Sequence, residues 1–119
     1  MSGIAAYKEN AVATQTKGKI VVLLYEGTVR FLRQAIQAIQ KGDMLEKGRL
    51  INKATEIIIE LSVSLDLEAG GEVAQNLRSL YNYIGEQLSR ANVQCDVQAL
   101  EDIISLLEEL NDGWKQVAT

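Results

Sequence analysis

A chain of 119 residues is long enough for one domain with its own hydrophobic core, and its single cysteine excludes an internal disulfide. The net charge of −4, without a cluster of basic residues, argues against nucleic acid as a partner. The absence of histidine removes the usual general base and most zinc and di-iron sites, so we expect neither a cofactor nor a metal.

The predicted elements are an N-terminal arm and four long helices joined by short loops. Residues 1–16 show no sustained apolar period and are expected to form the arm. The helices are expected at residues 17–41, 44–67, 72–91 and 97–117. Because short connections make successive helices alternate in direction, the sequence predicts an all-α, antiparallel up-down-up-down four-helix bundle over residues 17–119.

The predicted helix ends carry local signals. Gly42 is placed to end the first helix, and the pair Gly70-Gly71 is placed to break the chain before the third. Asp43, with Glu46 reaching back toward it, resembles a capping box at the start of the second helix. Asp96 is the expected N-cap of the fourth helix.

The first two helices carry more apolar surface than one core needs. In the first helix the apolar arc is about twice the ~100° that one packing face requires. In the second, Ile59 and Val63 form a further stripe, one turn apart, which Leu67 continues. The third helix has one narrow core stripe that begins with Val73. Trp114 closes the stripe of the fourth helix and is expected to pack against the first or the third.

This surplus must be covered by neighbouring helices or offered to a partner. A central position of the first helix would cover part of it, and the tyrosines could equally be core residues with their hydroxyls at the rim. No fifth helix is available for the second stripe, so we predict a partner-binding groove. The predicted groove residues are Val22, Tyr25, Val29, Ile36, Ile59, Val63, Leu67, Ile104 and Leu106.

No catalytic constellation accompanies the predicted groove. The acidic residues are typical of solvated helix faces, and Cys95 has no histidine to activate it. No apolar run approaches the ~20 residues that span a bilayer, and the N-terminus lacks the pattern of a signal peptide. We therefore expect a cytoplasmic protein that is not an enzyme and does not insert into a membrane.

Several short sequence elements occur in a fixed order along the chain. They are Ile4-x-x-Tyr7-x-x-Asn10-x-Val12-x-Thr14, Leu24-Tyr25-Glu26-Gly27 with Phe31-Leu32, Asn52-Lys53-Ala54 with Ile57-Ile58, Ser64-Leu65-Asp66, Gly70-Gly71-Glu72-Val73-Ala74-x-Asn76-Leu77, Leu80-Tyr81-x-Tyr83, Ala91-Asn92 and Trp114. Together they resemble the FliS family of flagellar export chaperones over about residues 4–117. The family commonly has Ser-Pro where this chain has Thr16-Lys17, a change that should slightly loosen the junction of arm and helix.

The resemblance implies a function that composition alone does not. Members of the family bind newly made flagellin in the cytoplasm and hold its C-terminal segment, which forms helices as it wraps the bundle. They thereby prevent premature polymerisation and deliver flagellin to the flagellar type III export machinery. The resemblance also implies that four arm residues cover the groove and contact the export gate protein: Ile4, Tyr7, Asn10 and Val12.

Two rival hypotheses stay open at this point. One is a helical bundle that self-associates through its surplus apolar face, as a weak homodimer, or that acts on other flagellar factors. The other is a small helical enzyme that uses only carboxylates, against which the missing histidine already argues.

Overall fold

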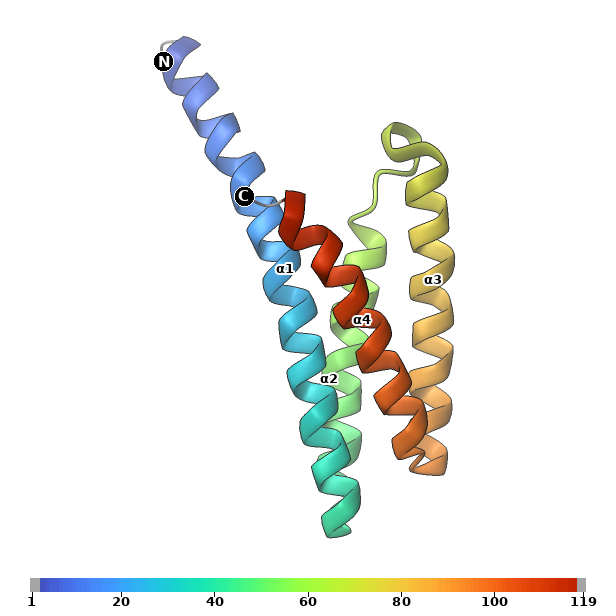
Figure 1. Ribbon diagram of the computed structural model, residues 1–119. Coiled ribbons are helices and arrows are strands. Elements are labelled where there is room, and N and C mark those ends of the chain that lie inside the picture. Colours follow the sequence, from blue (N-terminus) through green and yellow to red (C-terminus); the bar gives the residue numbers. More distant parts are fainter. Residues whose placement is uncertain (1–2, 118–119) are drawn as a thin grey trace.

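Four helices make up the part of the chain that the structure describes. The computed structural model describes the backbone of residues 3–117 and the side chains of residues 18–117. In chain order the helices are α1 (Gly3–Lys41), α2 (Met44–Val63), α3 (Leu67–Gln94) and α4 (Val97–Val117). Both α1 and α3 pack against α2 and α4, so the helices form a ring in sequence order (Figure 1). This arrangement confirms the predicted antiparallel four-helix bundle.

Side-chain and backbone caps explain where the helices begin and end. As predicted, Asp43 Oδ1 accepts a hydrogen bond from the backbone N–H of Glu46 at 3.1 Å. Asp96 caps α4 in the same way, accepting from the N–H three residues later at 3.0 Å. Gly42 ends α1 with φ at 78°, a conformation that glycine adopts without a steric cost. The predicted contact of the Glu46 carboxylate with Asp43 is absent among the described residues, because Glu46 pairs with Arg49 instead.

The first helix begins earlier than the sequence predicted. α1 starts at Gly3, whereas the expected start was Lys17. The intervening segment is rich in alanine and lacks proline, so its intrinsic propensity allows helix throughout. Figure 1 shows these first turns continuing past the C-terminal end of α4. The functional division into an arm over residues 1–16 and a bundle over residues 17–119 stays a prediction.

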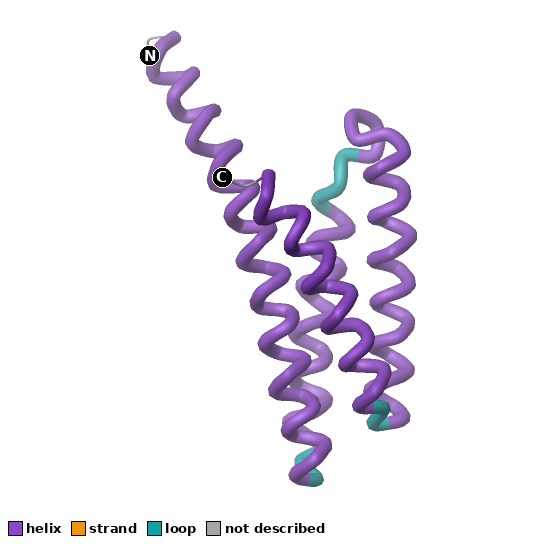
Figure 2. The backbone as a smooth tube through the Cα atoms, viewed as in Figure 1, coloured by secondary structure: helices purple, strands orange, loops and turns teal. Residues whose placement is uncertain are grey.

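The connection between α2 and α3 also differs from the prediction (Figure 2). α2 ends at Val63, and Asp66 then caps a new helix by accepting a hydrogen bond from the N–H three residues later at 2.9 Å. Leu67 is therefore the first residue of α3 and does not continue the stripe that ends at Val63. The predicted glycine break is confirmed, since Gly71 interrupts α3 with φ at 54° and ψ at −132°.

Apolar side chains from all four helices fill the core, together with one buried polar link between α1 and α3. Tyr25 and Tyr81 are 0% and 2% exposed, and their hydroxyl oxygens lie 2.5 Å apart. Burial raises the pKa of both tyrosines, and the hydrogen bond between them offsets only part of this rise for Tyr25. The centroids of the Trp114 and Tyr25 rings lie 6.4 Å apart, which confirms that Trp114 packs against the first helix.

Candidate functional site

The nine residues predicted to form one groove lie on different parts of the bundle. Val29, Ile36 and Ile104 line the face between α1 and α4. Ile59 and Val63 line the face between α2 and α3. The ring order of the helices puts these two faces on opposite sides of the bundle. The predicted residues therefore do not line one continuous groove, and which of them contact a partner stays a prediction.

Two of the predicted groove residues belong to the core. Tyr25 and Ile104 are 0% and 4% exposed, because neighbouring helices cover the parts of α1 and α4 that carry them. Leu106 lines a third groove, between α3 and α4, while Val22 and Leu67 are half-buried. The predicted arm residues have side chains outside the described part of the chain: Ile4, Tyr7, Asn10 and Val12.

The groove between α2 and α3 is an open depression with a volume of about 560 Å³, and most of its exposed lining is apolar. Ile59 and Val63 line it with 57% and 79% of their surface exposed, which confirms that both are accessible. The buried side chains of Ile58 and Tyr81 also contribute to its lining. Gly85 lines it from α3, and nothing lies within 4 Å of the position that a Cβ would take there. A side chain from a partner can therefore approach α3 closely.

A second apolar cleft, of about 310 Å³, opens at the end of the bundle where α2 ends and α3 begins. It shares Tyr81 with the α2–α3 groove, and Trp114 of α4 also lines it. Val73, which the sequence assigned to the core, is 69% exposed here. The backbone break at Gly71 and the divergence of α3 from α4 toward this end, visible in Figure 1, account for the exposure. No pattern in the sequence indicated this cleft, because the sequence placed Val73 on the core stripe.

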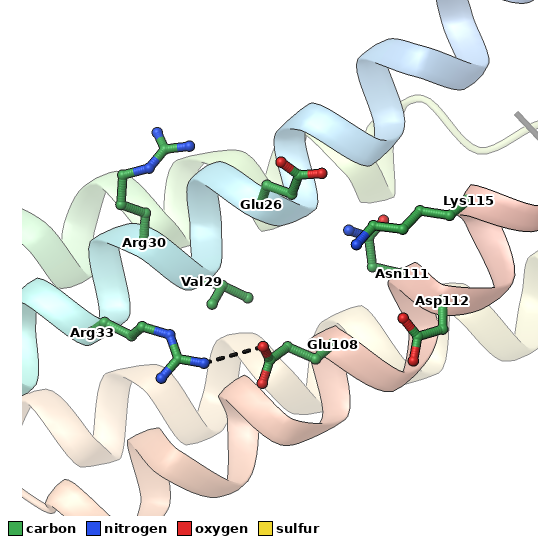
Figure 3. Close-up of a pocket in the computed structure, with 8 residues that line it drawn as sticks. All are labelled: Glu26, Val29, Arg30, Arg33, Glu108, Asn111, Asp112 and Lys115. Carbon is green, nitrogen blue, oxygen red and sulfur yellow. Dashed lines mark hydrogen bonds and ion pairs between the residues drawn. The ribbon is translucent and has the colours of Figure 1, made fainter.

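The opposite face, between α1 and α4, is charged (Figure 3). Arg33 donates a hydrogen bond to Glu108 at 3.1 Å across it, and both side chains are more than half exposed. Asn111 is 5% exposed there, and its Oδ1 has no hydrogen-bond partner within the described part of the chain. Charges of both signs make this face a poor match for an apolar segment. This face contains a cleft of about 330 Å³, and the other charged residues that line it are Glu26, Arg30, Asp112 and Lys115.

The described residues contain no group of three or more cysteine, aspartate or glutamate side chains that could hold a metal ion. None of the described helices is both long enough and apolar enough to cross a membrane. Cys95 Sγ lies 3.4 Å from Met44 Sδ and 3.6 Å from Lys47 Nζ, so these contacts join the start of α2 to the connection before α4.

Comparison with known proteins places this architecture in a family. The sequence model of the family described as "Flagellar protein FliS" matches residues 1–119. The chain belongs to the FliS family. The "Flagellar secretion chaperone FliS" of Salmonella typhimurium is 37% identical over 122 residues, which cover 98% of this chain and 90% of the relative. The FliS chaperone of Vibrio cholerae is 36% identical over 118 residues, covering 96% and 87%.

A solved structure supports the same fold. A crystal structure described as a flagellar chaperone from bacteria matches with a TM-score of 0.83 and 21% sequence identity, covering 98% of this chain and 97% of the other. The names of the FliS relatives describe flagellar secretion chaperones and not enzymes. The carboxylate-enzyme hypothesis is therefore discarded, and the family identified from the sequence is confirmed.

Proposed function

We propose that this FliS-family chain binds the C-terminal segment of flagellin in the α2–α3 groove. In the cytoplasm, binding keeps that segment from polymerising too early, and the chaperone then delivers flagellin to the flagellar type III export apparatus. The names of the relatives support a flagellar export client, and the family resemblance supports flagellin. The observation that carries the proposal is the pair Ile59 and Val63, exposed one helical turn apart in an apolar groove.

Helix-in-groove recognition gives the proposal its physical basis. A client segment that is disordered when free must become ordered on binding, which costs about 2–5 kcal/mol of binding free energy. The burial of apolar surface must contribute more than this cost. Complete burial of an exposed valine or isoleucine contributes about 1.5–3 kcal/mol. Because Ile59 and Val63 are already partly covered, we expect about 1–2 kcal/mol from each when a client helix covers them.

Calorimetry with a synthetic peptide of the flagellin C-terminus tests the proposal. The double variant Ile59→Asp/Val63→Asp should keep its helical circular dichroism spectrum, since both side chains are exposed. Its affinity for the peptide should fall more than tenfold, or more than ~1.4 kcal/mol, because the carboxylates would be desolvated in an apolar contact. Unfolding of this variant would show that the two residues are part of the core.

A matched control uses exposed apolar residues outside the groove. Leu45 and Val93 are 88% and 83% exposed, so Leu45→Asp/Val93→Asp introduces the same two charges elsewhere on the surface. This control should bind the peptide as tightly as the unchanged chain. An equal loss of affinity in both double variants would mean that added charge, and not the groove, weakens binding.

We also propose a functional role for the N-terminal residues. By resemblance to the family, Ile4, Tyr7, Asn10 and Val12 cover part of the groove when no client is bound, and Ile4 and Tyr7 help to engage the export gate protein. The apolar residues of this segment are too few to form a core and are spaced between polar ones, which suits a weak, reversible contact.

A further inference from the structure

We propose that two copies of this chain associate through the charged face between α1 and α4. In this dimer the two bundles lie parallel and are related by a twofold axis along the bundle, so that α1 of each copy packs against α4 of the other. Three features of the described residues support the pairing: the order of the charges on the two helices, the charges that have no partner within one copy, and one buried acceptor without a donor.

The charges on α1 and α4 follow opposite orders along this face. Arg33 of α1 and Glu108 of α4 form an ion pair at 3.1 Å, which fixes the level at which these two antiparallel helices meet. Seven residues from this pair, toward the start of α1 and the end of α4, are Glu26 and Lys115, and there the signs of the two helices are reversed. At both levels, therefore, one helix carries a positive and the other a negative side chain.

Arg30 and Asp112 complete this pattern between the two levels. A twofold axis along the bundle places α1 of one copy opposite α4 of the other at the same level, so each positive side chain meets a negative one. An axis perpendicular to the bundle through this cleft would instead bring Arg30 against Arg30 of the second copy, and like charges in contact are unfavourable. The charge order therefore favours the parallel dimer.

Most of these charges have no ion-pair partner within one copy. Among the described residues, Arg33 and Glu108 form the only ion pair across the α1–α4 face, and it is the one interaction marked in Figure 3. The other charged residues around the cleft are exposed and remain available to a second copy: Glu26, Arg30, Asp112 and Lys115. Complementary charges of this kind set the register and orientation of an interface.

The cleft also contains a buried acceptor that needs a donor. Asn111 is 5% exposed, and its Oδ1 has no hydrogen-bond partner among the described residues. Asn111 directly precedes Asp112 on α4, so the twofold axis places Arg30 of the second copy at the same level. A guanidinium group has five N–H donors and no acceptor, so this arginine can donate to Asn111 Oδ1 while it pairs with Asp112.

The proposed dimer leaves the client groove free in both copies. The α2–α3 groove lies on the side of the bundle opposite the α1–α4 face, so it points outward from the dimer. Exposed ion pairs contribute little affinity, and salt screens them. We therefore expect a weak dimer, with a dissociation constant on the order of 0.1 mM, as is typical of a small and mostly polar interface.

Sedimentation equilibrium of two single variants, alone and mixed, tests the proposed pairing. Arg30→Glu brings acidic groups together in its own dimer and Asp112→Arg brings basic groups together, so each variant alone should dimerise about tenfold more weakly than the unchanged chain. An equimolar mixture restores opposite charges at both contacts and should form heterodimers about as tight as the unchanged dimer. Arg78→Glu makes the same charge change on the exposed surface of α3, outside this face, and should leave dimerisation unaltered.

The unchanged chain provides a readout that does not depend on any variant. Its dimer should weaken about tenfold when the salt concentration is raised from about 0.05 to about 0.5 M. A chain that stays monomeric at about 1 mM and low salt, or a dimer that salt does not weaken, would overturn the proposal. A mixture of the two variants, both helical by circular dichroism, that associates no more strongly than either variant alone would overturn it as well.

Discussion

The buried hydrogen bond between Tyr25 and Tyr81 should contribute measurably to the stability of the bundle. The hydroxyl oxygens are 2.5 Å apart, and the two residues are 0% and 2% exposed. Changing either tyrosine to phenylalanine removes a single oxygen, so little cavity forms, but it leaves the other hydroxyl buried without this partner. That unsatisfied group should cost about 1–3 kcal/mol of unfolding free energy in each single variant.

The double variant Tyr25→Phe/Tyr81→Phe separates this effect from a general loss of packing. It leaves neither hydroxyl unpaired, so its loss of stability should be smaller than the sum of the two single losses by about 1 kcal/mol or more. Urea unfolding of all four proteins, followed by circular dichroism and by Trp114 fluorescence, gives this coupling free energy. Single losses that add up in the double variant would refute the claim that the hydroxyls act as a pair.

Three further predictions follow from the same core and from the N-terminus. Burial raises the pKa of Tyr25 and Tyr81 in the folded chain. The unfolded chain therefore releases its phenol protons at a lower pH than the folded chain does. Above pH ~10, the free energy of unfolding should fall by about 1.4 kcal/mol per pH unit for each of the two tyrosines. Urea titrations of the double phenylalanine variant should show no such fall. Trp114→Ala should cost about 2 kcal/mol in urea unfolding, below the range for fully buried tryptophan because the ring is only partly buried, and a loss under about 1 kcal/mol would place the ring outside the core. Deleting residues 2–12 should preserve folding, leave peptide affinity in calorimetry unchanged or tighter by up to ~1 kcal/mol, and weaken docking to the export gate; a tenfold loss of peptide affinity would make these residues part of the client site.

The helices and most of their ends were predictable because the signals are local. Aspartate caps at Asp43 and Asp96 and the glycines at 42 and 71 act on backbone groups a few residues away. The early end of α2 was missed because apolar residues recur as far as Leu67, while Asp66 acts as the cap of the next helix. The helical start at Gly3 was missed because the segment lacks apolar period, although its composition allows helix.

The candidate site was less predictable, because exposure depends on which helices become neighbours. Ile59 and Val63 were identified correctly as exposed, since they lie off the main stripe of α2. Tyr25 lies on the surplus apolar arc of the first helix and was therefore predicted as a groove residue, yet α3 and α4 cover it through Tyr81 and Trp114. Val73 shows the opposite error, because its place on the apolar stripe of α3 predicted burial, whereas it is 69% exposed at the end of the bundle where α3 diverges from α4.

Site-specific photo-crosslinking with flagellin tests the central claim most directly. A photoreactive amino acid at position 63, inside the α2–α3 groove, should form a covalent product that maps to the flagellin C-terminal segment. The same group at position 93, which is equally exposed but outside the groove, should form none. Crosslinking at position 93 or at position 30 on the charged α1–α4 face, with none at position 63, would contradict the assignment of the client to the α2–α3 groove.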